Sequence, residues 1–195
     1  MFIYLASQSP RRRELLEQIG VEYQTLTVDV EEQRSDNESP TEYVQRLSLD
    51  KAKAGALLKQ DHPVLGADTI VVLNDTVLEK PQSEVHGIEM LLRLSGNTHQ
   101  VMTAVTVVYG ERCETRVNVT SVRFRPLSEQ EARQYWLSGE PKDKAGGYGI
   151  QGKAAVFVEE IQGSYSAVVG LPLFETANLL ETFFSVKWSV AIIQH

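Results

Sequence analysis

An unusual concentration of arginine near the amino terminus gives the first indication of chemistry. Residues 11–13 are three arginines, and they follow the polar segment 7–10 (SQSP). The apolar residues 2–5 predict a short strand, and the pair Ser9-Pro10 predicts that a helix begins there. The first turn of a helix is already electropositive. Guanidinium groups, free backbone N–H groups and the hydroxyls of Ser7 and Ser9 therefore favour a phosphate-binding site over a solvated basic patch.

A carboxylate within an apolar run gives the second indication. Residues 64–73 are predicted to form one strand, which is apolar except for Asp68 and Thr69 near its middle. A buried carboxylate is costly unless it is paired, hydrogen-bonded or bound to a metal. We interpret Asp68 as a functional residue rather than a loop cap, because the strand pattern continues directly after it. Glu32, in an acidic predicted loop, could supply a second carboxylate to a divalent metal that also binds phosphate oxygens.

Three lysines are candidates for binding a polyphosphate. Lys80 precedes Pro81 after a predicted hairpin, and it either projects towards Asp68 or is an ordinary surface lysine. Lys51 and Lys53 lie on one predicted helix, so we expect one of them to face the site and the other to face solvent. Together with the arginines they form a local positive region, which suits a small polyphosphate better than a long nucleic-acid backbone.

A glycine-rich segment, residues 143–152 (DKAGGYGIQG), can approach a ligand closely through its backbone. Its spacing is neither that of a Walker A loop nor that of a dinucleotide-binding fingerprint, and a flexible turn is the alternative interpretation. Gln151 carries both a donor and an acceptor, which suits reading the edge of a base. His99 lies in a polar segment that enters a strand, and we interpret it as a structural, hydrogen-bonding histidine rather than a catalytic one.

Composition limits the class of protein. The chain has 195 residues, 42% hydrophobic content, one cysteine and a net charge of −7. This is enough for one substantial core, or for two lobes that share a sheet. The acidic balance argues against a general nucleic-acid binder. No run is long and apolar enough to span a membrane, and the short apolar start does not resemble a signal peptide. A single cysteine fits a reducing compartment.

Strands and helices alternate along the chain, which predicts an α/β or α+β fold with a large mixed sheet. Capping boxes at residues 39–42 and 128–131 mark the start of two helices. Strands are expected near residues 2–5, 21–30, 64–73, 77–78, 100–109, 115–124, 155–161 and 165–169. Helices are expected over residues 10–19, 40–59, 84–94, 129–138 and 172–184.

Taken together, these segments resemble the Maf family of nucleoside triphosphate pyrophosphatases. The resemblance runs from about residue 3 to residue 184 and follows the family's order. The matching motifs are residues 7–12 (SQSPRR), 31–32 (EE), 51–54 (KAKA), 66–69 (GADT), 79–81 (EKP), 95–99 (SGNTH), 143–152 (DKAGGYGIQG) and 170–173 (GLPL). Residues 185–195 match nothing expected of the family, and we interpret them as a variable tail of one domain that spans residues 1–195.

The resemblance implies an α/β fold like that of inosine triphosphate pyrophosphatases, with an elongated mixed sheet and two lobes around a deep cleft. It implies a cytoplasmic homodimer that uses a divalent metal cation, Mg²⁺ or Mn²⁺. The implied reaction is that of a hydrolase acting on a phosphoanhydride bond. A nucleoside triphosphate is cleaved between its α and β phosphates, which gives a monophosphate and pyrophosphate. Neither nucleic acid nor a membrane is expected as a partner.

The resemblance also implies roles for individual residues. Asp68 is the proton acceptor that activates water, and Asp68 and Glu32 contact the metal. The implied phosphate contacts are Ser7, Arg12, Lys51 and Lys80. The implied base-selecting positions are Arg11, Thr69 and Gln151. This last combination resembles the branch of the family that acts on dTTP and UTP.

Two alternatives remain open at this point. One is a pyrophosphatase of the same fold that prefers a purine nucleotide or 7-methyl-GTP. The other is a non-catalytic nucleotide-binding regulator of cell division, because family members are associated with arrest of division as well as with removal of modified nucleotides. Release of pyrophosphate by the purified protein would separate an enzyme from a regulator, and a panel of substrates would separate the two enzymes.

Overall fold

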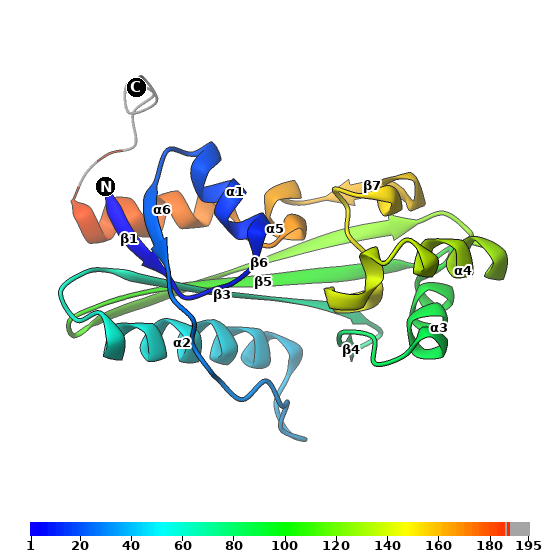
Figure 1. The fold of residues 1–195 in the computed structure, drawn as a ribbon, viewed down its shortest axis with the longest axis horizontal. Coiled ribbons are helices and arrows are strands. Elements are labelled where there is room, and N and C mark those ends of the chain that lie inside the picture. The colour runs from blue at the N-terminus through cyan, green and yellow to red at the C-terminus, as the bar shows by residue number, and fades with distance from the viewer. Residues whose placement is uncertain (186, 188–195) are drawn as a thin grey trace. The chain divides into compact units, whose positions relative to one another are not determined.

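The computed structural model describes residues 1–185 and 187; the other residues of the expected tail, 186 and 188–195, lie outside the described residues (Figure 1). The strands are β1 (Phe2–Leu5), β2 (Glu22–Thr25), β3 (Val64–Leu73), β4 (Thr76–Leu78), β5 (Thr98–Tyr109), β6 (Arg112–Phe124) and β7 (Val158–Gln162). The α-helices are α1 (Pro10–Gln18), α2 (Pro40–Leu58), α3 (Glu84–Leu94), α4 (Glu129–Leu137), α5 (Tyr165–Val169) and α6 (Leu173–Phe184). Three 3₁₀ helices cover Glu140–Asp143, Ala145–Gly147 and Lys153–Phe157.

The strands form one mixed sheet in the order β2-β1-β3-β5-β6-β7. The short strand β4 also pairs with β3 but is not part of this linear order. β1 pairs in parallel with both β2 and β3, whereas β4 and β7 pair antiparallel with their neighbours. The predicted α/β class with a mixed sheet is therefore confirmed. None of the described helices is long and apolar enough to cross a membrane.

The chain divides into two compact units. The first contains residues 1–68, 103–118 and the chain from Gly170 onward, and the second contains residues 69–102 and 119–169. One boundary falls inside β3, between Asp68 and Thr69. The expected catalytic position of this strand, Asp68, thus belongs to the first unit, and the expected base-selecting position, Thr69, belongs to the second.

The first unit packs α2 closely against β3. A Cβ atom on Gly66 would lie 2.5 Å from the backbone nitrogen of Ala52, so only glycine allows this approach. The hydroxyls of Ser48 on α2 and Thr106 on β5 are buried and lie 2.7 Å apart. In Figure 1, α2 lies on one side of the strands of this unit and α6 on the other. The close approach at Gly66 brings the side chains of α2 next to those of β3.

Local sequence signals explain most element boundaries. Ser39 and Ser128 form complete capping boxes: each serine hydroxyl accepts from the backbone N–H of Glu42 or Glu131, and that glutamate's carboxylate accepts from the backbone N–H of the serine. Asn74 and Asp75 both have positive φ angles, 48° and 62°, which is the backbone of the tight hairpin predicted between β3 and β4.

Three local predictions were wrong. Residues 165–169 form a helix rather than a strand, because the Ser164 hydroxyl accepts a hydrogen bond from the backbone nitrogen of Ala167 and caps a first turn. The extended segment predicted over residues 21–30 is a strand only from Glu22 to Thr25. The strand predicted over residues 155–161 begins only at Val158, because residues 153–157 form a 3₁₀ helix. The predicted helix start at Ser9-Pro10 is confirmed, although the Ser9 side chain makes no capping hydrogen bond and its backbone nitrogen donates to Ser7 Oγ.

Candidate active site

Asp68 is the centre of the polar cluster in the first unit. It lies on β3 and is 8% exposed, as expected for a carboxylate within an apolar strand. The ammonium of Lys51 on α2 donates to Asp68 Oδ1 over 2.6 Å. Because side chains alternate along a strand, Asp68 shares its face with Gly66, where α2 makes its closest approach. The glycine thus allows the lysine to reach the carboxylate.

Lys51 also contacts the second predicted carboxylate. Its Nζ atom lies 2.6 Å from Glu32 Oε1 as well as 2.6 Å from Asp68 Oδ1. Counting side-chain atoms alone, Lys51 is 12% exposed, Asp68 11% and Glu32 44%. The two carboxylates therefore converge on one cation, with Asp68 inside and Glu32 at the solvent side. Of the two lysines considered on this helix, Lys51 faces the cluster and Lys53 is exposed.

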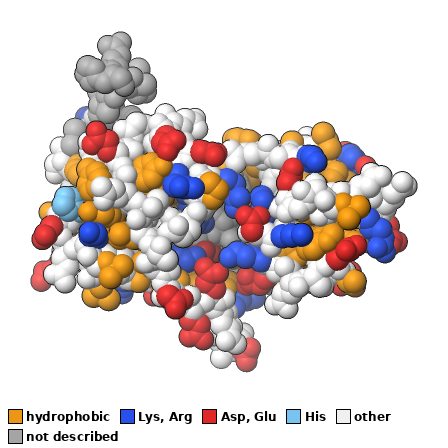
Figure 2. All heavy atoms as spheres, viewed as in Figure 1, with side chains coloured by type: hydrophobic (Ala, Val, Ile, Leu, Met, Phe, Trp, Pro, Cys, Tyr) orange, Lys and Arg blue, Asp and Glu red, His pale blue; other side chains and the backbone are white. Residues whose placement is uncertain are grey.

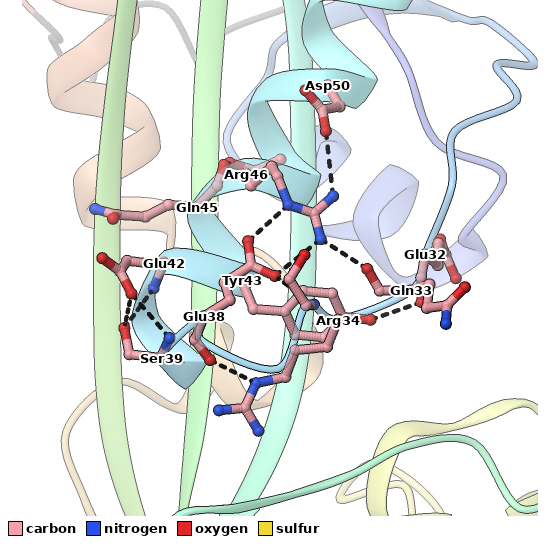
Figure 3. A network of polar contacts seen from close by, with 12 residues as sticks. Glu32, Gln33, Arg34, Glu38, Ser39, Glu42, Tyr43, Gln45, Arg46 and Asp50 are labelled. Atoms are coloured by element: carbon pink, nitrogen blue, oxygen red, sulfur yellow. Dashed lines mark hydrogen bonds and ion pairs between the residues drawn. The ribbon is translucent and has the colours of Figure 1, made fainter.

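The segment that carries Glu32 is fixed to α2 by a polar network (Figure 3). The buried Tyr43 hydroxyl donates to the backbone carbonyl of Glu32 over 2.8 Å. Arg46 donates to the carbonyl of Gln33 over 2.9 Å and to both carboxylate oxygens of Glu38, over 2.6 and 3.0 Å. The hydrogen bond from Arg46 lowers the pKa of the Glu38 carboxyl. Figure 2 shows acidic side chains gathered on the segment between β2 and α2.

Arg12, the second arginine of the basic run, is half-buried and makes two hydrogen bonds within the first unit. Its Nε donates to the Gly170 carbonyl over 2.8 Å, and its Nη1 donates to Ser7 Oγ over 3.1 Å. Burial lowers the pKa of the Arg12 guanidinium, while the charges of Asp68 and Glu32 act in the opposite direction. Arg12, its neighbour Ser7 and the two carboxylates therefore share one electrostatic environment. The predicted phosphate contacts Ser7 and Arg12 lie at the same end of α1.

Gly170 supplies the carbonyl that holds Arg12. Its φ angle is +136°, a conformation that favours glycine, and its carbonyl receives the Arg12 Nε–H group. The motif at residues 170–173, to which the sequence assigned no role, thereby orients Arg12, a residue predicted to bind phosphate.

The second unit holds the other predicted site residues. Lys80 is exposed and follows β4, and the adjacent Glu79 carbonyl accepts a hydrogen bond from Gly146 of the glycine-rich segment over 3.2 Å. Thr69 is half-buried at the start of this unit's part of β3, and Gln151 is exposed. The segments that carry Lys80 and Gln151 are thus hydrogen-bonded within one unit.

Comparison with known proteins identifies the family. Residues 2–183 match the family model described as Maf-like protein. The chain belongs to the Maf-like family. It is 60% identical over 190 residues to a protein of Saccharophagus degradans named dTTP/UTP pyrophosphatase, covering 95% of this chain and 90% of that protein.

Further relatives carry the same name. A protein of Alkalilimnicola ehrlichii is 54% identical, covering 93% of this chain and 92% of that one, and a protein of Aliivibrio fischeri is 55% identical, covering 93% and 97%. Both are named dTTP/UTP pyrophosphatase. Among solved structures, the Ham1 protein of Staphylococcus aureus is similar with a TM-score of 0.48 and 18% identity, covering 64% of this chain and 72% of that one.

The carboxylate pair fits the divalent cation that the Maf resemblance implies. Within the described residues, no group of three or more His, Cys, Asp or Glu side chains is arranged to hold a metal ion. Mg²⁺ does not need such a cage, because it combines one or two carboxylates with waters and substrate phosphates. Glu32 and Asp68 already converge on one ammonium group, so the same oxygens can converge on a metal ion.

Sequence reasoning missed several residues that build this Maf site. Tyr43 and Arg46 lie on α2 among residues that read as helix core and solvated helix surface, yet they hold the backbone beside Glu32. Lys51 was expected to contact phosphate; in the structure its ammonium contacts the two carboxylates, and a phosphate contact remains a prediction. The sequence around Glu32 gives no signal that Tyr43 and Arg46 hold its backbone.

Proposed function

We propose that this protein hydrolyses dTTP and UTP to the nucleoside monophosphate and pyrophosphate. The observation that carries the proposal is the pair of carboxylates, Asp68 and Glu32, converging on the Lys51 ammonium, with the half-buried Arg12 interacting electrostatically with both carboxylates. A site with a strand-held carboxylate and several cations suits attack on a polyphosphate, where charge must be neutralised and a water must be activated. The names of the relatives support the substrate assignment.

Asp68 is the residue that accepts a proton from the attacking water. The water oxygen forms a bond to the α or the β phosphorus as the P–O bond between the two phosphates breaks, which separates the nucleoside monophosphate from pyrophosphate. Arg12 and Ser7, and in the second unit Lys80, bind the phosphate oxygens. Asp68 and Glu32 would hold Mg²⁺ or Mn²⁺, which when bound neutralises phosphate charge and lowers the pKa of bound water. We also propose a cytoplasmic homodimer, as the family resemblance implies.

Base choice is assigned to Arg11, Thr69 and Gln151. Uracil and thymine present two carbonyl acceptors on either side of one N–H donor. Arg11 offers donors only, Thr69 offers a donor or an acceptor, and Gln151 offers both at once. A site built for this edge disfavours a mismatched base because its own polar groups lose their partners, an effect of about 1–3 kcal/mol per buried group.

A substrate panel tests the proposal. The assay measures kcat/KM for dTTP, UTP, CTP, dATP, GTP and 7-methyl-GTP with Mg²⁺ or Mn²⁺, together with the Gln151→Ala variant. We expect dTTP and UTP to be the best substrates and Gln151→Ala to reduce the preference. If GTP or 7-methyl-GTP is the best substrate, the base assignment is wrong. If no nucleotide releases pyrophosphate, the protein is not the proposed enzyme and the regulator alternative is favoured.

A further inference from the structure

The glycine-rich segment is held by side chains that lie outside it. The Tyr148 hydroxyl lies 2.7 Å from Nε2 of His99, at the start of β5. Both residues are buried, with exposures of 6% for Tyr148 and 1% for His99. The next residue, Gly149, donates its backbone N–H to the Tyr135 hydroxyl of α4 over 3.1 Å. Two consecutive residues of the segment are thus fixed from β5 and from α4.

Aromatic packing encloses the His99–Tyr148 pair. The rings of His99 and Tyr148 each meet the Phe124 ring edge to face, at centroid distances of 5.0 and 4.8 Å. Burial lowers the pKa of His99 to about 4, so the imidazole is neutral at neutral pH. Among the described residues, His99 Nδ1 has no hydrogen-bond partner. The bond to Tyr148 is therefore the main polar constraint on this ring, and losing it would leave a buried imidazole poorly satisfied.

A second anchor lies just beyond Gln151. The backbone nitrogen of Lys153 donates to both carboxylate oxygens of Glu140, over 2.9 and 3.2 Å. Gln151 therefore lies between two fixed points, Tyr148 and Lys153, although its own side chain is exposed. A side chain in solvent gains a defined direction only from its backbone, and here the backbone is held on both sides.

The segment also lies against the strand that carries Thr69. Gly146 has a φ angle of +67°, and a Cβ atom there would lie 2.9 Å from both Cγ atoms of Val71. Val71 follows Thr69 by two residues on β3, so the two side chains point to the same face of the strand. The glycine-rich segment therefore packs at Gly146 against the β3 face to which Thr69 belongs.

We propose that His99 and Tyr148 are positioning residues for base selection: their buried hydrogen bond fixes the backbone that presents Gln151 to the base. The inference rests on the proposed function and goes beyond it, because neither residue touches the substrate in this account. A purely structural role is the competing explanation. It predicts a less stable protein with unchanged selectivity, whereas a positioning role predicts a change in selectivity in a folded protein.

The test compares Tyr148→Phe and His99→Gln with the wild type. Tyr148→Phe removes one oxygen atom and keeps the ring, and Tyr165→Phe is the matched control, because Tyr165 is a half-exposed tyrosine of the same unit. We expect Tyr148→Phe and His99→Gln each to reduce the ratio of kcat/KM for UTP over GTP about tenfold. The KM for UTP should carry the change, and kcat should stay within about twofold, since the proton acceptor lies in the first unit. The double variant should be no worse than the single variants, because both changes disturb the same buried contact.

Assays run below the unfolding midpoint of each variant separate selectivity from stability. An unchanged UTP-to-GTP ratio in folded Tyr148→Phe overturns the inference, even if the variant unfolds at a lower temperature. A fall in kcat as large as the fall in kcat/KM overturns it as well. A wild type that hydrolyses no nucleotide refutes the proposed function itself. A selective wild type with equally selective variants refutes only the positioning role. Should His99→Gln fail to fold, the result for Tyr148→Phe decides.

Discussion

Replacing Lys51 with methionine probes the polar cluster directly, because methionine keeps the unbranched chain and removes the charge. The ammonium lies 2.6 Å from both Asp68 and Glu32, so the variant leaves two carboxylates facing each other. Removing one partner of a buried ion pair costs about 3–5 kcal/mol, and an exposed pair contributes at most about 1 kcal/mol. The Asp68 pair is close to the buried case and the Glu32 pair is close to the exposed case. The positive charge of Arg12 offsets part of the lost electrostatic stabilisation.

We therefore expect Lys51→Met to lower the free energy of unfolding by about 2–3 kcal/mol, which corresponds to roughly 5–10 °C in Tm for a chain of this size. A divalent cation competes with the ammonium for the same oxygens, so the variant should bind Mn²⁺ more tightly than the wild type does. Affinity that is tenfold higher adds about 1.4 kcal/mol, or roughly 3–5 °C, to the stabilisation by Mn²⁺.

The assay is thermal unfolding with and without Mn²⁺, supported by titration calorimetry, in the absence of nucleotide. Lys53→Met removes the same charge from an exposed position of the same helix and serves as the control. The expected result is a larger Mn²⁺ shift in Lys51→Met than in wild type or Lys53→Met, together with a lower kcat/KM for UTP. An equal or smaller Mn²⁺ shift in Lys51→Met would refute the reasoning that lysine and metal share one pair of ligands.

Three further predictions test other parts of the site. Asp68→Asn should reduce UTP hydrolysis by at least about 100-fold while the circular dichroism spectrum is kept, because the amide cannot accept the proton; near wild-type turnover would show that another group is the base. Gly170→Ala should raise the KM for UTP several-fold by displacing the carbonyl that holds Arg12, whereas Gly110→Ala, also at positive φ but in open space, should not; equal effects would mean that backbone strain alone is responsible. The pKa of His99 is lowered to about 4, so the unfolded state binds more protons than the folded state between pH 6.5 and 4. The free energy of unfolding should therefore fall by up to about 3 kcal/mol as the pH drops through this window. Denaturant titrations at pH 7 and 4.5 should show a smaller change in the free energy of unfolding for His99→Gln than for the wild type, and an identical change would contradict the buried neutral histidine.

Residues with strong local signals could be predicted well from the sequence. The capping boxes at Ser39 and Ser128 fixed the starts of α2 and α4, and the apolar run of β3 has the predicted bounds, Val64–Leu73. Asp68 stood out because a carboxylate in such a run needs a partner, and the structure supplies one in Lys51. The interpretation of His99 as a hydrogen-bonding histidine is also confirmed.

The failures have two physical causes. In one case a single weak local hydrogen bond decides the secondary structure, and in the others the contact that builds the site joins residues far apart in the sequence. Residues 165–169 are aromatic and β-branched enough to suggest a strand, yet one hydrogen bond to Ser164 starts a helical turn. The Tyr43 hydroxyl binds the Glu32 carbonyl, and the Gly170 carbonyl binds Arg12 at the other end of the chain. No spacing or periodicity encodes such pairs, because they exist only after the sheet has brought the segments together.

Product analysis of UTP hydrolysis in ¹⁸O-labelled water tests the central claim most directly. The purified protein is incubated with UTP and Mg²⁺ or Mn²⁺, and the products are identified by mass spectrometry. We predict UMP and pyrophosphate in equal amounts, with one ¹⁸O atom per turnover in one of these two products and none in orthophosphate. Formation of UDP with label in orthophosphate would contradict the proposed cleavage between the α and β phosphates.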